Sequence, residues 1–247
     1  MSDKENGMIY SQISQYYNKW SSGNKYYVAS GKFYIEEALK HNSTIVELGV
    51  GTGRIAGEIL KKSMNKVIGV DNCEEMLKQT EKQIKKEYAD RLMLLKQDFR
   101  ELKLPFKCEY IYMPFRTFGH LENNEDRTRT LKAVKKNLLS GGVFIFDHYV
   151  LDQGWAQKVS NEQVLMYEDS DIRITDEYSF DFNNKKMHCI VRCNDVIFES
   201  FEFYWFDVKS IFKIIKEVGF KVKNLYGDFN RSEYTNKSVN QIWVLEN

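Results

Sequence analysis

The chain has 247 residues, of which 43% are hydrophobic and 29% are charged, a balance typical of a globular protein. With 36 Lys and Arg against 35 Asp and Glu, the net charge of +1 implies no globally basic surface of the kind that non-specific nucleic-acid binding requires. A local patch of lysines at residues 61–66 and 82–86 is an alternative to solvated helix faces, which we favour. No stretch reaches the roughly 20 apolar residues of a membrane span, and the first residues are polar. We expect a cytoplasmic α/β protein with no membrane or nucleic-acid partner.

Four cysteines are scattered along the chain, and only Cys189 and Cys193 lie close together, four residues apart. Such an isolated pair is weak support for a zinc site, so we predict reduced thiols and no metal.

The first segment of interest, residues 8–39, carries aromatic and apolar side chains at helical spacing, with a turn cluster at residues 21–24. It predicts two helices ahead of the sheet. Packing explains most of its tyrosines, although each buried hydroxyl needs a hydrogen-bond partner.

Residues 44–54 combine a short apolar strand, glycines at every second position (Gly49, Gly51 and Gly53) and the start of a helical pattern. Glycine lets a backbone pass close beneath a ligand, and the N–H groups of the turn and helix start face whatever lies above the strand. A plain turn is one alternative. A nicotinamide or flavin loop is another, but its G-x-G-x-x-G frame places the third glycine one residue later.

The next apolar strand, residues 66–71, ends in Asp71, which lies 22 residues after Gly49. That spacing suits a carboxylate that accepts hydrogen bonds from both hydroxyls of a ribose, although a helix N-cap is the alternative. Met76 follows in a predicted helix, where it either covers a flat purine face or packs in the core.

Two further strands are predicted at residues 91–99, which end in Asp98-Phe99, and at residues 109–113, which end at Pro114. Asp98 is also a candidate N-cap. The segment after Pro114 contains Arg116 and His120 among apolar neighbours, so each either reaches a ligand or pairs internally. A fifth strand at residues 143–147 places Asp147 and His148 at the same crevice, because open α/β sheets bind ligands at the carboxyl ends of their strands.

Between residues 164 and 206 the composition changes to segments rich in β-branched and aromatic residues, which are separated by turns at 183–184 and 194–195. This predicts an antiparallel meander inserted after the fifth strand. A helix at 208–218 and a final antiparallel pair of strands, 220–226 and 240–245, close the main sheet.

The frame E-x-G-x-G-x-G, from Glu47 to Gly53, resembles the first motif of class I S-adenosylmethionine-dependent methyltransferases, and later elements follow in the family's order: Asp71, Asp98-Phe99 and residues 139–142. The resemblance implies a Rossmann-like α/β fold whose seven-stranded, mostly parallel sheet has a reversed last strand, with S-adenosyl-L-methionine as cofactor. It implies these cofactor contacts: Glu47, Gly49, Gly51, Gly53, Asp71, Met76, Asp98, Phe99 and Met113. The predicted units are an N-terminal helical segment (1–40), a cofactor-binding core (41–150 and 207–247) and an antiparallel β insertion that caps the substrate (151–206).

Two features are similar to small-molecule N-methyltransferases that act on amino groups of sugars or amino acids: the segment 16–20 and the sequence of residues 118–121, followed by a β insertion. This likeness implies that Tyr17 and His120 are catalytic and lie near the transferred methyl group, with His120 a candidate base or an orienting group. Arg116, Asp147 and His148 are the candidate acceptor contacts.

The sequence departs from the Asp/Asn-Pro-Pro-Tyr motif of nucleic-acid and glutamine methyltransferases, because residues 113–116 have one proline and no amide. We therefore predict methyl transfer to a small molecule, with an amine favoured over a hydroxyl. The alternatives are an RNA or protein acceptor, or a non-catalytic interaction module. The sequence is also compatible with a homodimer.

Overall fold

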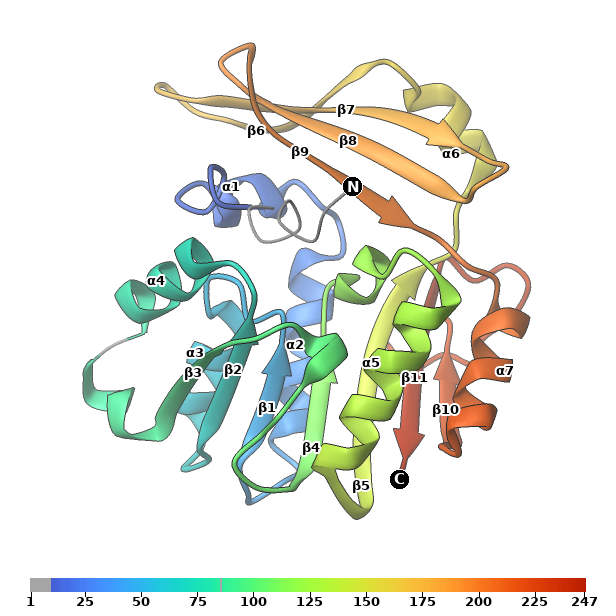
Figure 1. Cartoon of the computed structure of the whole chain (residues 1–247). Coiled ribbons are helices and arrows are strands. Elements are labelled where there is room, and N and C mark those ends of the chain that lie inside the picture. Colours follow the sequence, from blue (N-terminus) through green and yellow to red (C-terminus); the bar gives the residue numbers. More distant parts are fainter. Residues whose placement is uncertain (1–9, 85) are drawn as a thin grey trace.

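A computed structural model describes residues 10–84 and 86–247; residues 1–9, at the start of the predicted N-terminal segment, lie outside the described residues. A seven-stranded sheet forms its centre, in the order β10-β11-β5-β4-β1-β2-β3 (Figure 1). Strand β11 pairs antiparallel with β5 and β10, whereas the other pairs are parallel. The predicted fold class is therefore confirmed. The strands are β1 (Ile45–Leu48), β2 (Val67–Asp71), β3 (Leu92–Lys96), β4 (Cys108–Met113), β5 (Leu138–Tyr149), β10 (Lys221–Tyr226) and β11 (Asn240–Glu246).

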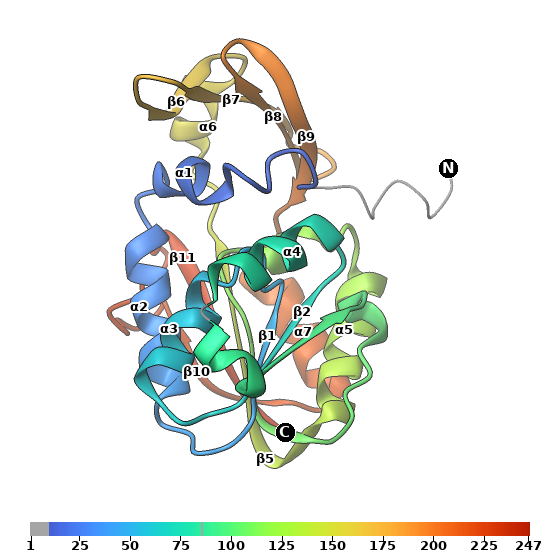
Figure 2. The ribbon, with the colours of Figure 1, turned by 90° about the vertical axis from the view of Figure 1, so that its left-hand side faces the viewer.

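Helices cover both faces of this sheet (Figure 2). On one face lie α2 (Tyr27–Ala38) and α3 (Arg54–Lys62), and on the other α5 (Asn124–Asn137) and α7 (Val208–Val218). Because successive side chains of a strand point to opposite faces, Tyr110 and Tyr112 of β4 join the α2–α3 core while Ile111 joins the α5–α7 core. Burial on both faces explains why the central strands read as continuous apolar runs.

Shorter elements connect the strands. Helix α4 (Glu74–Gln83) follows β2, and three 3-10 turns complete the core: η1 (Lys86–Arg91), η2 (Phe99–Glu101) and η3 (Thr117–His120). Among the described residues, no helix has the length and apolar content of a membrane span.

A second, four-stranded antiparallel sheet lies above the carboxyl ends of the main strands (Figure 1). After α6 (Gln153–Val159) it consists of β6 (Gln163–Glu168), β7 (Arg173–Asp181), β8 (Lys186–Cys193) and β9 (Val196–Tyr204). The turn between β8 and β9 has positive φ at both Asn194 (49°) and Asp195 (67°), the geometry of the tight hairpin turn that these residue types favour. The predicted meander is therefore present.

Helix α1 (Tyr17–Ser22) lies between the second sheet and the core (Figure 1). Trp20 packs in an apolar cluster with residues of the second sheet, including Ile174 and Phe201. Its indole Nε1 donates to the carboxylate of Asp176 at 2.7 Å, which satisfies the one polar atom of a buried tryptophan. Helix α1 and the second sheet therefore form one roof over the main sheet.

The roof is also tied to the core through Asn18. Its amide oxygen accepts a hydrogen bond from the hydroxyl of Thr52 at 2.7 Å, and its amide nitrogen donates to Gln83 of α4 at 2.9 Å. This side chain thus holds α1 across the loop between β1 and α3.

Candidate active site

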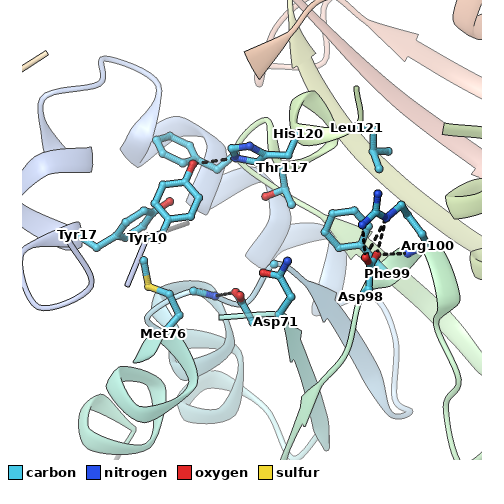
Figure 3. A pocket seen from close by; sticks show the side chains of 14 residues that line it. Tyr10, Tyr17, Asp71, Met76, Asp98, Phe99, Arg100, Thr117, His120 and Leu121 are labelled. Atoms are coloured by element: carbon cyan, nitrogen blue, oxygen red, sulfur yellow. Dashed lines mark hydrogen bonds and ion pairs between the residues drawn. The ribbon is translucent and has the colours of Figure 1, made fainter. Parts of the chain in front are cut away.

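A pocket holding about 850 Å³ of empty space, part of it open to solvent, lies beneath the roof at the carboxyl ends of β1, β2 and β4. In Figure 3, Asp71 and Met76 lie on one side of it, Tyr10, Tyr17 and His120 on another, and Asp98 at the far end. The structure brings together eight of the predicted site residues as lining groups: Tyr17, Gly49, Gly51, Asp71, Met76, Asp98, Phe99 and His120.

The glycine loop and Asp71 meet directly. The carboxylate of Asp71 accepts hydrogen bonds from the backbone N–H of Gly51 and of Cys73, each at 2.9 Å. Burial raises the pKa of Asp71, and these two hydrogen bonds counteract part of that rise. The backbone of Asn72 also bonds this carboxylate, which with about four lone-pair sites can still accept a hydroxyl from the pocket.

Gly51 leaves space where any other residue would carry a side chain. Its φ is +57°, and a Cβ atom built there would meet only the ring of Tyr17, at 4.0 Å. The backbone is therefore bare toward the pocket, as required for close approach of a ligand. The bare backbone at Gly51, the carboxylate of Asp71 and the flanking Met76 form a cradle. This glycine cradle fits the sugar and amino-acid portions of S-adenosylmethionine.

At the far end of the pocket, the carboxylate of Asp98 is held by Arg100. The Arg100 guanidinium donates to both carboxylate oxygens, and its backbone N–H donates to one of them at 2.8 Å. Burial opposes ionisation of Asp98, but the hydrogen bonds and charge of Arg100 outweigh it and lower the pKa. Asp98 thus stays an anionic acceptor beside Phe99. The adenine contact expected for it remains a prediction.

His120 is paired with a residue that the sequence did not single out. The hydroxyl of Tyr10 lies 2.8 Å from the imidazole Nε2 of His120, and the two rings meet edge to face (Figure 3). Burial lowers the pKa of His120 to about 4, opposed by a hydrogen bond with the backbone of Glu202 on β9. At pH 7 the imidazole is therefore neutral: a good hydrogen-bond acceptor, but a weak base.

The turn after β4 carries two residues in the left-handed region, Phe115 with φ 56° and Arg116 with φ 65°. For non-glycine residues this conformation costs about 1–2 kcal/mol each. Asp147 holds the turn, because its carboxylate accepts the backbone N–H of Phe115 at 2.8 Å and of Arg116 at 3.1 Å. Asp147 thereby aims the Phe115 and Arg116 side chains beneath the roof.

A second cavity, holding about 700 Å³ of empty space, lies between this turn and the second sheet. Most of its lining is aromatic, and it contains the carboxylate of Asp176 and the guanidinium of Arg116. Tyr10, Tyr17 and Phe115 line both cavities, so these three side chains stand between them.

Five predicted contacts do not line either cavity. Glu47 points to the α2–α3 face, where its carboxyl accepts a hydrogen bond from the Tyr112 hydroxyl. Gly53 packs closely against α4, because a Cβ atom there would lie 2.7 Å from the Thr80 side chain. Both residues therefore serve internal packing. Met113 is fully buried in the α5–α7 core.

The remaining two are Asp147 and His148. Asp147 is occupied by the turn described above and by the hydroxyl of Tyr34 at 2.7 Å. His148 points to the opposite strand face, is fully buried and stacks on Phe206 with ring centroids 4.1 Å apart. Asp147 and His148 are neighbours in β5, so their side chains point to opposite faces of the sheet. Their position at the end of the strand alone does not bring them into a cavity.

The sequence reasoning missed several lining residues of the first pocket: Tyr10, Asn72, Arg100, Phe115, Thr117 and Leu121. Three of them belong to the segment after Pro114, where position at the carboxyl end of a strand was an available signal. Tyr10 and Arg100 carry no local signal, because only the folded roof and η2 bring them to the pocket.

The buried carboxyl of Glu47 gives a testable pH dependence. Burial raises its pKa to about 8, so the folded protein binds this proton more tightly than the unfolded chain, and the free energy of unfolding falls as pH rises from about 4.5 to 8. Glu47→Gln mimics the protonated group and removes this loss. We expect the variant to gain up to about 5 kcal/mol relative to the native chain between pH 5 and pH 9, measured by urea unfolding. Glu125→Gln, at an exposed position of α5, is the control, and parallel curves for Glu47→Gln and the native chain would contradict the assignment.

Comparisons with known proteins agree with the observed fold. A family model described as a methyltransferase domain matches residues 45–142. A search of the curated proteins returned no match.

Solved structures similar to this chain share the whole fold. An S-adenosylmethionine-dependent methyltransferase from Clostridium acetobutylicum is 19% identical, with 96% of this chain and 98% of that chain covered and a TM-score of 0.78. The CcbJ methyltransferase from Streptomyces caelestis is 18% identical, with 95% and 96% covered and a TM-score of 0.78. A sugar N-methyltransferase from Streptoalloteichus is 11% identical, with 94% and 92% covered and a TM-score of 0.70.

Proposed function

We propose that this chain, whose residues 45–142 match a methyltransferase domain, transfers a methyl group from S-adenosylmethionine to an amine nitrogen of a small-molecule acceptor. The observation that supports this proposal is the pair of cavities that share Tyr10, Tyr17 and Phe115. One cavity has the glycine cradle and Asp71, which suit the cofactor. The other is lined mainly by aromatic side chains with a few polar groups, the kind of lining that binds small organic molecules. The sugar N-methyltransferase among the similar structures favours an amine acceptor.

The residues that would hold S-adenosylmethionine are Gly51, Asp71, Met76, Asp98 and Phe99, and the cofactor when bound supplies a methyl group on a positively charged sulfur. Little covalent chemistry then falls to the protein. Its main task is to align the acceptor nitrogen with the methyl group. Good alignment lowers the activation free energy by on the order of 7–11 kcal/mol.

Exclusion of water falls to the residues between the cavities. Burial raises the pKa of Tyr17 and of Tyr10, so both phenols stay neutral at physiological pH. Their rings, with that of Phe115, provide dry walls that suit a transition state in which charge becomes dispersed.

His120 has a defined part in this arrangement. As a neutral imidazole bonded both to the Tyr10 hydroxyl and to the backbone of Glu202, it fixes the orientation of the Tyr10 phenol beside the acceptor. A pKa of about 4 makes it too weak a base to remain protonated near neutral pH. The proton of the amine is therefore released toward solvent rather than stored on His120.

We also propose that the protein works in the cytoplasm. The four cysteines are all unpaired thiols, which fits a reducing compartment.

The test combines cofactor binding with product detection. Calorimetric titration with S-adenosylhomocysteine is expected to give saturable binding. Incubation with S-adenosylmethionine and a panel of amino sugars and amino acids, each matched to its hydroxyl analogue, is expected to give a product heavier by one methylene for an amine only. Methylation of the hydroxyl analogues would contradict the nitrogen acceptor, and failure to bind S-adenosylhomocysteine would contradict the function as a whole.

A further inference from the structure

The Arg116 guanidinium lies in the second cavity without a counter-ion at contact distance. Among residues 10–84 and 86–247, no carboxylate forms an ion pair with it and no side chain or carbonyl accepts from it, although its own backbone N–H donates to Asp147. The carboxylate in the same cavity, Asp176, is occupied by Trp20 and by the hydroxyl of Tyr178 at 2.6 Å. Arg116 is half-buried, and a guanidinium with little access to water normally has a paired anion, because an unpaired charge there is costly.

Aromatic rings hold this guanidinium in place instead. Its central carbon lies 5.2 Å from the ring centroid of Tyr26 and 5.3 Å from that of Tyr149, within the range of cation–π attraction. Such rings fix the direction of the planar group but accept none of its N–H donors in conventional hydrogen bonds. The donors of Arg116 therefore remain available to a ligand.

Tyr149 provides a second, independent observation. This residue is 9% exposed and lines the same cavity, and its hydroxyl has no hydrogen-bond partner among the described residues. Buried hydroxyl groups are usually satisfied, so an unsatisfied one beside an unpaired guanidinium marks a position where a bound group completes both.

We propose that the methyl acceptor carries an anionic oxygen group, a carboxylate or a phosphate ester, that binds the Arg116 guanidinium and accepts the Tyr149 hydroxyl. This inference rests on the proposed function and narrows the acceptor to an amine that also bears an anion. The planar fork of arginine matches either oxyanion in a bidentate manner, which lysine cannot reproduce. Because Phe115, the neighbour of Arg116 in the chain, lines both cavities, the anion anchors the acceptor beside the cofactor pocket.

The strained turn at Phe115 and Arg116 is consistent with this role. Two adjacent non-glycine residues with positive φ are unfavourable unless the surroundings enforce them, and Asp147 does so by binding both N–H groups. The same carboxylate lies near enough to favour the charged guanidinium electrostatically, while burial lowers the pKa of Arg116.

The test is calorimetric titration with two probes, sodium acetate and inorganic phosphate, at constant ionic strength, with and without saturating S-adenosylhomocysteine. The native chain is expected to bind one of the two; the preferred probe identifies a carboxylate or a phosphate ester as the natural group. Arg116→Met is expected to weaken this binding about 10- to 100-fold, and Tyr149→Phe about 10-fold. Arg116→Lys should fall between the native chain and Arg116→Met.

Arg129→Met is the matched control, since Arg129 is exposed on α5 and pairs with Glu101 outside the cavity. It should bind the probes as the native chain does. Absence of binding by both probes, or equal binding by Arg116→Met, would overturn the anion site. If Arg116→Met does not fold, the other two variants provide the test. Equal probe binding by Tyr149→Phe, Arg116→Lys and the native chain would then overturn the anion site. The S-adenosylhomocysteine titration of the same samples reports on the proposed function separately, because loss of cofactor binding with retained anion binding contradicts only that function.

Discussion

Replacing Asp71 with alanine is expected to lower the affinity for S-adenosylhomocysteine about 100-fold or more, as measured by calorimetric titration. The carboxylate holds the N–H groups of Gly51 and Cys73, and hydrogen bonds to a charged acceptor contribute about 1.5–3 kcal/mol each. Its loss would leave two backbone donors without their acceptor and release the loop that forms the floor of the pocket. The same change removes the acceptor for the hydroxyls of the ribose.

A control with the same local chemistry exists elsewhere in the chain. Asp228 also accepts from two backbone N–H groups, those of Asn230 and Ser232, but lines neither cavity. Asp228→Ala should bind S-adenosylhomocysteine normally. Asp71→Asn keeps one acceptor oxygen and should show an intermediate affinity. Native affinity in a folded Asp71→Ala protein would be incompatible with a cofactor site at this position.

The second large effect is expected at His120. His120→Ala should lower kcat about 100-fold, because loss of the imidazole releases the Tyr10 ring and a displacement of about 1 Å near the reacting atoms can cost that much. The dissociation constant of S-adenosylhomocysteine should stay within about 3-fold of native, because the imidazole contacts Tyr10 rather than the glycine loop. With a pKa of about 4, His120 should also produce no inflection in the native pH–rate profile between pH 5.5 and 8. Both measurements use the amine acceptor identified from the panel.

Tyr10→Phe separates the two roles open to His120. If the imidazole acts by orienting the Tyr10 phenol, this variant should reproduce most of the loss seen in His120→Ala. His188→Ala, on β8 and outside both cavities, is the control for removal of a histidine. A native profile with a histidine inflection near pH 6.5 that disappears in His120→Ala would instead establish His120 as a base.

The parts of the site that could be predicted are those encoded by short distances along the chain. Asp71 follows the glycine loop at a fixed spacing, and parallel neighbouring strands bring both to one edge of the sheet. The Gly51 N–H to Asp71 bond is the direct result. Tyr17 and His120 come from distant segments, and only the resemblance to N-methyltransferases linked them.

The misplaced residues have a common physical cause. Position at the end of a strand does not say which face a side chain takes, and His148 faces the Phe206 side whereas Asp147 faces Tyr34 and the turn. Asp176 is a residue of the second cavity that the sequence could not predict. It sits in a strand pattern without any motif, and its part in the second cavity arises from packing of β7 against Trp20, a contact between residues 156 positions apart.

Among the described residues, the second sheet contributes side chains to the second cavity and none to the first. Asp71 and the glycine loop belong to the main sheet, whereas Asp176 and Tyr178 of the second cavity come from an inserted hairpin array that contributes no strand to that sheet. If the second cavity binds the acceptor, as proposed, substitutions in this array are expected to change acceptor selectivity while the Asp71 and glycine-loop contacts remain. Grafting β7 and β8 from a homologue is thus a rational route to altered selectivity.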